Sequence, residues 1–330
     1  MNRYRDQIAG ALRAVEIRGP TRYAWLGRTS QRLAADIEAA MDDRARQAYL
    51  ASGIGAELYH SFFCQGGPVP ARWGQTEPIG ADPSLAAALS DANTGHSGWE
   101  HGWTVVRVED DGTVVAAGRA RARIASGDCR AVGSFRPGVR ASVRVPKELP
   151  SHSPGFYTAL GDTPADADAA PGVVRSYWHV TRTGACELMR AVTGRLNAAC
   201  VPFRLKVADH PARLHRCDAA VLYLPADRFG PVRASLLEVA EGLGPRLRPA
   251  IPALTLELAP GVGLAEDDGG AKSFGTRRSE LLASGIVRAD VLGLTRIADR
   301  LGAVAERFAE DGVAIDAPYL EPSLEGRHAL

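Results

Sequence analysis

The segment 173–225 constrains the fold more than any other part of the chain, because it predicts two β-strands joined by a helix. The strands are predicted at 174–180 and 202–207, and side chains alternate between the two faces of a strand. In both strands this alternation separates apolar side chains from polar ones. The shared polar face would carry Arg175, Tyr177, His179, Arg204 and Lys206. Such a face has the groups needed to hold a phosphate and to move a proton beside it.

The C-terminal half alternates predicted helices and strands around this segment. In chain order we expect a helix at 183–199, a short helix from Asp209, an apolar strand at 219–224, a helix at 231–243, a strand at 254–258 and a long helix at 292–308. A helix between consecutive strands favours a right-handed crossover and parallel pairing of neighbours. The two cationic strands are therefore expected to be parallel neighbours, with their polar face turned away from the crossover helix.

The N-terminal half has a different character. Apolar residues recur at helical spacing at 33–41 and 51–63, and the turn sequence at 110–112 predicts a β-hairpin. A further strand is predicted at 141–145, and the Gly- and Pro-rich stretch 153–172 marks a boundary. The predicted fold is α+β, with a helical and β-hairpin N-terminal part at 1–150 and a mixed-sheet C-terminal part containing βαβ units at 151–330.

Composition limits the classes of protein to which this chain can belong. Its 39 Lys and Arg residues nearly balance 38 Asp and Glu residues, which gives a formal net charge of +1. General nucleic-acid binders and membrane-surface binders carry a clear basic excess, so neither partner is expected. The 5 cysteines are an odd number without a CxxC pair, which suits reduced thiols. No signal peptide or membrane-spanning apolar run is evident, so we expect a cytoplasmic protein.

Familiar cofactor and metal motifs are incomplete. The glycines at 261–263 lack the third glycine of a dinucleotide-binding loop, and the spacing around Lys272-Ser273 does not match a P-loop. His210 and His215 are five residues apart, which does not place both on one helical face as zinc ligands. Cys200 is followed by Lys206 where a cysteine phosphatase loop needs arginine. We therefore predict no cofactor and no metal.

The polar face matches the needs of phosphate elimination. This reaction requires a base for the Cα proton, an acid for the leaving group, and cations for the phosphate. Lys206 becomes a plausible base if burial and the neighbouring Arg204 lower its pKa. The same residues also suit a solvated face of an amphipathic sheet. Likewise Arg216 could cap a short helix, and Arg278 could pair with Glu280 or Glu266. The residues alone leave these alternatives open.

Several longer stretches of the sequence resemble a known protein family. The chain is similar to the HopA-type type III effector family from about residue 58 to residue 283, and most clearly after residue 153. The strings that carry the resemblance are SPGFY from Ser153, RSYWH from Arg175, VPFRLK from Val201, RCDAAVLY from Arg216, LAPGVGLAE from Leu258 and SFG from Ser273.

The resemblance implies an activity and a set of partners. Family members in lanthipeptide- and thioamitide-type biosynthetic clusters are regarded as cofactor-independent lyases. They eliminate phosphate from phosphoserine or phosphothreonine of a ribosomally made precursor peptide, giving dehydroalanine or dehydrobutyrine. A separate kinase supplies the phosphate and is the expected partner subunit. A non-catalytic peptide- or kinase-binding adaptor is the alternative, and a metal-free phosphatase is a third reading.

The resemblance also assigns roles to residues. Lys206 matches the family lysine and is the expected general base, while His179 or Tyr177 would protonate the leaving group. Four arginines would share the phosphate: Arg175, Arg204, Arg216 and Arg278.

Overall fold

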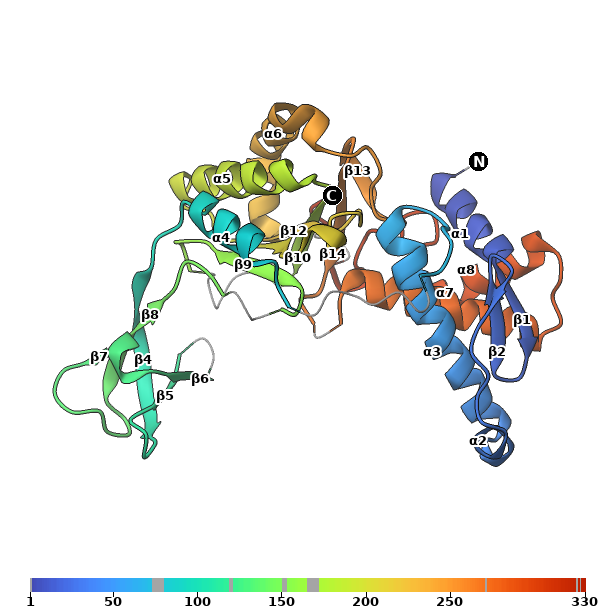
Figure 1. The fold of residues 1–330 in the computed structure, drawn as a ribbon, viewed down its shortest axis with the longest axis horizontal. Helices are drawn as coiled ribbons and strands as arrows, with labels where there is room; N and C mark the ends of the chain where they lie inside the picture. Colours follow the sequence, from blue (N-terminus) through green and yellow to red (C-terminus); the bar gives the residue numbers. More distant parts are fainter. Residues whose placement is uncertain are drawn as a thin grey trace.

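A computed structural model describes residues 2–72, 80–118, 121–149, 153–164, 172–270, 272–324, 326 and 328–330. These residues form three parts that follow one another along the long axis of the molecule (Figure 1). A small β-module lies at one end, a central sheet covered by helices lies in the middle, and a helical part lies at the other end. The predicted α+β class is confirmed.

The central sheet has six strands in the order β13-β14-β10-β12-β11-β9, and all neighbours in it are antiparallel. Its strands are β9 (Phe156–Leu160), β10 (Val173–Trp178), β11 (Arg204–Ala208), β12 (Ala220–Pro225), β13 (Leu256–Ala259) and β14 (Val262–Asp267). The predicted strands at 174–180, 202–207, 219–224 and 254–258 thus exist with small shifts of their ends.

One expectation about this sheet is wrong. The cationic strands β10 and β11 are not parallel neighbours, because β12 lies between them and pairs antiparallel with both. β10 and β11 therefore run in the same direction, but they are separated by one strand. Of the two glycines at 261–263, Gly261 lies in the turn that precedes β14, and Gly263 belongs to this buried strand. Gly263 is required there because a Cβ would lie 2.5 Å from Oγ1 of Thr255.

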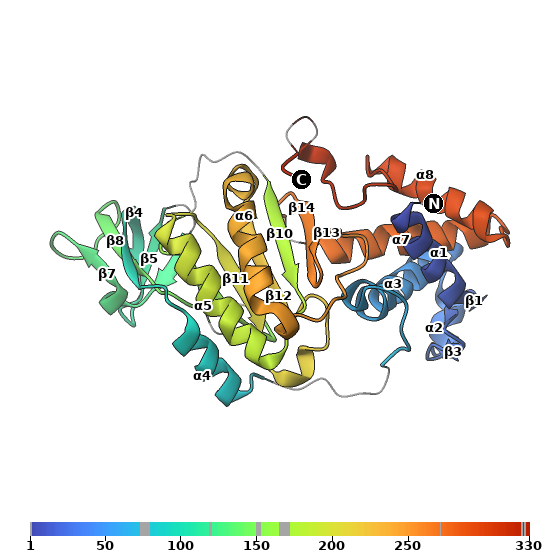
Figure 2. The same ribbon diagram turned by 90° about the horizontal axis from the view of Figure 1, so that it is seen from above.

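Three helices cover one face of the central sheet (Figure 2). They are α4 (Pro83–Ala92), α5 (Arg182–Ala198) and α6 (Ala226–Leu243). The apolar side chains of the cationic strands pack beneath them, among them Val174, Trp178 and Leu205, all at 0% exposure. The predicted division of each strand into an apolar and a polar face is therefore confirmed, and the polar face looks away from α5.

The helical part is built from both ends of the chain. It contains α1 (Arg3–Ala14), the antiparallel strands β1 (Val15–Gly19), β2 (Arg22–Trp25) and β3 (Arg28–Thr29), and the helices α2 (Ala35–Ala40), α3 (Asp43–Ser61), α7 (Phe274–Val291) and α8 (Ile297–Glu310). Its core joins Ile8 and Leu58 to Ile286 and Phe308. The division of the chain at residue 150 stays a prediction, although this core draws on residues from both sides of it.

The expected helix at 292–308 corresponds to α8, which begins only at Ile297, and the helix α7 before it was not predicted. The break between the two helices follows α7 at Gly293, whose φ of +67° is a left-handed conformation that glycine adopts at helix ends. The predicted helix at 33–41 is also shorter, since α2 spans only Ala35–Ala40 and buries no residue. The strands β1–β3 were not predicted.

The β-module contains β4 (Gly98–Val108), β5 (Val114–Ala117), β6 (Arg121–Ile124), β7 (Cys129–Ala131) and β8 (Arg140–Val145). They form a five-stranded sheet in the order β6-β5-β4-β8-β7, with a small core of its own. The predicted hairpin turn at 110–112 joins β4 to β5, and Gly112 has the expected positive φ. Short 3-10 helices complete the structure at Phe63–Gln65, Ser126–Asp128, Pro211–Arg213, Gly244–Arg246 and Pro322–Leu324. Within the described ranges, no helix is both long and apolar enough to cross a bilayer.

The contact between α7 and α8 can be tested with a glycine variant. A Cβ on Gly285 would lie 2.8 Å from the Cα atom of Val304, which is closer than unbonded carbons approach. We expect Gly285→Ala to lower the free energy of unfolding by about 1–3 kcal/mol, because the helices must move apart. Gly302→Ala is the matched control, since its Cβ would meet nothing within 4 Å. It should be neutral or stabilising by up to about 1 kcal/mol. Urea unfolding measures the free energy of unfolding of both variants. An unchanged free energy in Gly285→Ala would contradict the close packing of α7 against α8.

Candidate functional site

The register of the central sheet brings the cationic strands together through β12. Tyr223 of β12 pairs with Arg175 on one side and with Arg204 on the other. One step along the same face, Val221 pairs with Tyr177 and with Lys206. Directly paired residues share a face of the sheet. The polar face therefore carries two rows of side chains that run across three strands.

Tyr223 is the centre of the first row. Its ring centroid lies 4.4 Å from the guanidinium carbon of Arg204, 5.0 Å from that of Arg175, and 5.4 Å from Nζ of Lys206. The negative face of an aromatic ring attracts cations at such distances. We call these four residues the Tyr223 cluster. Tyr223 was not among the residues predicted from sequence. The strand at 219–224 was predicted, but it was not expected to lie between the cationic strands, so its side chains were not assigned to the polar face.

The charge of the Tyr223 cluster is only partly balanced. Arg175 forms an ion pair with Asp267 at 2.9 Å, and among the described residues no carboxylate pairs with Arg204 or Lys206. Burial, together with the positive charges of Arg204 and Arg175, lowers the pKa of Lys206 to about 8. A lysine with this pKa exchanges its proton near neutral pH.

Polar atoms without a partner point to an anion site at the same place. The Nε atoms of Arg175 and Arg204 are buried and have no hydrogen-bond partner within the described structure, and the same holds for Oγ1 of Thr158. Thr158 pairs with Lys206 on the neighbouring strand β9. Buried donors are normally satisfied, so a ligand that accepts several hydrogen bonds would suit this surface.

Tyr177 lies in the second row, but other aromatic rings cover it. It is 3% exposed, and its ring meets that of Phe63 edge-on with centroids 5.9 Å apart. Phe274 packs in the same small apolar cluster. Burial raises the pKa of the Tyr177 hydroxyl, so the group keeps its proton. Aromatic side chains from the 3-10 helix Phe63–Gln65 and from α7 thus cover Tyr177.

His179 follows the far end of β10. Four residues of strand separate it from Arg175, which corresponds to about 13 Å along the sheet. The side chain is buried, and its Nδ1 lies 3.1 Å from the carbonyl oxygen of Ala250, to which it donates. Burial lowers its pKa, so the ring is neutral at pH 7. His179 is therefore not part of the Tyr223 cluster.

The two remaining predicted arginines have internal partners. Arg216 forms an ion pair with Asp218 at 2.8 Å and also contacts the Cys64 thiol and the Tyr59 hydroxyl. Arg278, at 2% exposure, donates to the carbonyl oxygens of residues 318 and 320 at 2.7 and 2.8 Å. Of the four predicted phosphate-binding arginines, the structure brings only Arg175 and Arg204 together with Lys206.

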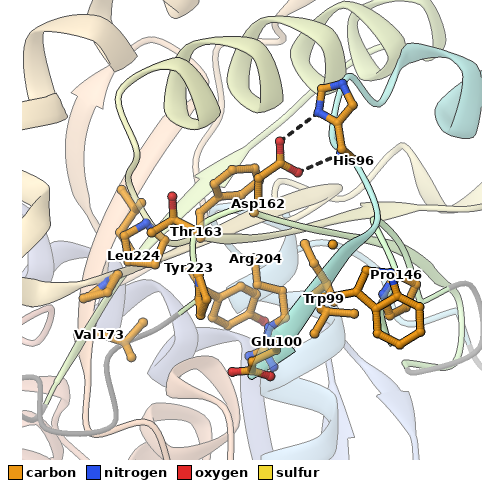
Figure 3. A pocket seen from close by; sticks show the side chains of 18 of the residues that line it. His96, Trp99, Glu100, Pro146, Asp162, Thr163, Val173, Arg204, Tyr223 and Leu224 are labelled. Carbon is orange, nitrogen blue, oxygen red and sulfur yellow. Dashed lines mark hydrogen bonds and ion pairs between the residues drawn. The ribbon is translucent and has the colours of Figure 1, made fainter. Parts of the chain in front are cut away.

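A pocket of about 440 Å³ opens at the end of the polar face (Figure 3). Arg204 and Tyr223 form one of its walls, and Trp99 and Pro146 from the root of the β-module lie on another side. At its rim Asp162 accepts hydrogen bonds from His96. Across the part of the chain that the structure describes, no group of three or more His, Cys, Asp or Glu residues is arranged to hold a metal ion.

Comparison with known proteins shows which family this chain matches. The model of a family described as the HopA1 effector protein family matches residues 148–320, which is more than half of the chain. Two solved structures of effector proteins are similar. The protein from Pseudomonas syringae pv. tomato strain DC3000 shares 14% identity at a TM-score of 0.47, over 83% of this chain and 95% of that one. The protein from Pseudomonas syringae pv. syringae strain 61 shares 16% at 0.46, over 84% and 94%. No curated protein matches.

The charge coupling within the Tyr223 cluster can be measured directly. Arg204→Gln should raise the pKa of Lys206 from about 8 towards the ordinary lysine value of 10.5, because one of the two nearby positive charges is removed. The lysine would then stay charged to higher pH. NMR titration of isotope-labelled dimethyl-lysines reports this shift, with Lys147 and Lys272 as internal references.

The control is Arg233→Gln, on the exposed side of α6 and hence beyond the other face of the sheet. It should leave the titration of Lys206 unchanged. An unchanged pKa in Arg204→Gln would mean that burial alone sets the value.

Proposed function

The chain belongs to the HopA1 effector protein family, and on this premise we propose that it is a cofactor-independent phosphoserine/phosphothreonine lyase. Its substrate would be a ribosomally made precursor peptide that a separate kinase has phosphorylated, as in lanthipeptide biosynthesis. The product would be dehydroalanine or dehydrobutyrine. The observation that carries the proposal is the Tyr223 cluster. In it a lysine of lowered pKa lies beside two arginines whose Nε atoms have no hydrogen-bond partner among the residues that the structure describes.

Lys206 would act as the general base. With a pKa of about 8, roughly one tenth of the lysine is neutral at pH 7, and the fraction rises with pH. The neutral amine takes the Cα proton of the phosphoresidue, and the electron pair of that C–H bond forms the Cα=Cβ double bond. The Cβ–O bond breaks at the same time, so inorganic phosphate leaves with the bonding electrons.

Arg175 and Arg204 would hold the phosphate. Guanidinium groups bind phosphate through two parallel hydrogen bonds, and such bonds strengthen as negative charge collects on the leaving group. The buried Nε atoms of both arginines are donors still without a partner within the described structure. Arg216 and Arg278 would have to give up internal partners before they could share this role.

Tyr223 is our preferred acid for the leaving group. Burial raises the pKa of its hydroxyl, so the proton is present at neutral pH. The ring touches all three cations, whereas His179 and Tyr177 lie farther along the sheet or beneath other rings. The short distances from the Tyr223 ring to the three cations support this choice of acid.

A binding role is the competing proposal. A cytoplasmic adaptor could use the same cations only to dock a phosphopeptide or the kinase subunit. The lowered pKa of Lys206 favours the lyase, because a docking cation works best when it remains fully charged. Both proposals place the phosphopeptide on the same surface, so the product decides between them.

The base assignment is tested with Lys206→Ala. Wild-type protein incubated with a phosphorylated precursor peptide should yield a product lighter than the unphosphorylated peptide by one water, measured by mass spectrometry. Lys206→Ala should lose this activity while it still binds the phosphopeptide, because the arginines remain. Lys272→Ala, at an exposed lysine paired with Glu280, is the control and should retain activity. Full elimination by Lys206→Ala would refute the assignment, and a product of unphosphorylated mass would show hydrolysis.

The acid assignment is tested with Tyr223→Phe. This change keeps the ring that faces the cations and removes only the hydroxyl. We expect kcat to fall by about 10²–10⁴-fold, as for loss of a general acid, with little change in KM. Tyr49→Phe, at a tyrosine that is 40% exposed, should change neither constant. A raised KM with unchanged kcat would instead show that Tyr223 contributes to substrate binding and is not the general acid.

A further inference from the structure

We propose that the pocket beside Arg204 binds apolar side chains next to the phosphoresidue of the substrate peptide, so that the protein selects phosphopeptides with apolar neighbours. This inference rests on the proposed function, since it places the phosphate at the Tyr223 cluster. It adds a specificity site that the cations alone do not provide.

The pocket and the Tyr223 cluster form one continuous surface. Arg204 and Tyr223 line the pocket as well as the cluster. Leu160 pairs with Arg204, and Val173 precedes Arg175 by two residues, so both lie on the polar face of the sheet and both line the pocket. A peptide whose phosphate contacts Arg204 would therefore extend its neighbouring residues into the pocket (Figure 3).

The pocket is larger than a phosphate needs. Its volume of about 440 Å³ lies within the range of roughly 300–1,000 Å³ that is typical of sites for whole small molecules. Two parts of the chain that are far apart in sequence enclose it, the ends of the sheet strands and the root of the β-module. Trp99 of that root is stacked against Arg130, whose guanidinium carbon lies 3.8 Å from the ring centroid. This contact gives the wall a defined position.

Most of the wall is apolar. The apolar lining residues whose side chains are not buried in the core beneath the helices are Trp99, Val145, Pro146, Leu160, Val173 and Pro225. Burial of a leucine-sized side chain in such a site improves binding by about tenfold to a hundredfold. The prolines and the short strand ends add little flexibility, so the pocket exists before the peptide arrives.

The charges at the pocket oppose acidic side chains. Asp162 is held by His96, whose backbone N–H donates at 2.7 Å and whose ring Nδ1 lies at 3.0 Å. Glu100 accepts a hydrogen bond from the indole of Trp103 at 3.0 Å. Both carboxylates line the pocket, so a flanking Asp or Glu that lies beside them and away from Arg204 would meet negative charge. The arginines would therefore bind the phosphate, and the pocket would select apolar residues next to it.

The test compares three phosphothreonine peptides that differ only in the two residues on each side, which are all Leu, all Ala or all Asp. Affinities come from fluorescence anisotropy and turnover from mass spectrometry. The Leu peptide should bind at least about tenfold more tightly than the Ala peptide, which corresponds to about 1.4 kcal/mol, and the Asp peptide should bind most weakly. Equal affinity for the Leu and Ala peptides would overturn the proposal.

A variant that fills the pocket tests whether the preference for apolar neighbours arises there. Thr163 lines the pocket, and Thr163→Trp should bring the ratio of affinities for the Leu and Ala peptides close to one. Thr295→Trp, in the exposed connection between α7 and α8, is the control and should keep the ratio. Turnover of a blocked single phosphothreonine, which has no neighbours, should be the same in Thr163→Trp and wild type. If Thr163→Trp keeps the wild-type ratio of affinities for the Leu and Ala peptides, the preference arises elsewhere and the proposal is overturned.

The outcomes separate this inference from the proposed function. A preference for the Leu peptide without elimination would refute the lyase and support the pocket as a peptide site. Elimination without any preference would refute the pocket and leave the lyase intact.

Discussion

Three cationic side chains meet around one aromatic ring because a single strand, β12, pairs with both strands that carry them. Like charges at this distance repel one another, and partial burial strengthens the repulsion. The ring of Tyr223 and the carboxylate of Asp267 offset part of this cost. The remaining repulsion contributes to the lowered pKa of Lys206. Among the described residues, the Nε atoms of Arg175 and Arg204 also have no hydrogen-bond partner. An anion that binds here would relieve the repulsion, and this supports the proposed role of the cluster in binding phosphate.

The surrounding fold keeps this cluster in place. Helices α4, α5 and α6 bury the apolar face of the sheet, so its strands cannot turn their cations inward. On the polar face, Phe63 and Phe274 cover the part that carries Tyr177. Towards the β-module the face is left open and becomes the pocket. The helical part and the β-module thus lie at opposite ends of the central sheet (Figure 1).

Much of the candidate site could be predicted from sequence, and the reasons differ between residues. Arg175, Arg204 and Lys206 were placed on one polar face because strand alternation is a local property of the backbone. The choice of Lys206 came from the family resemblance, and its lowered pKa agrees with that choice. Tyr223 was missed because its strand was not expected between the other two. The partners of Arg216 and Arg278 could not be foreseen, since Asp218, Cys64 and the carbonyl groups near residue 320 reach them only in the folded chain.

The sequence by itself determined which side chains share a face of each strand, where the hairpin of the β-module turns, and to which family the chain is similar. These features follow from neighbouring residues and from ordered strings of sequence. Only the tertiary structure decided that β12 separates the cationic strands, that β14 is a strand, and that a pocket adjoins Arg204. Strand order depends on contacts between residues far apart in the chain, and local periodicity contains no information about which distant strands pair.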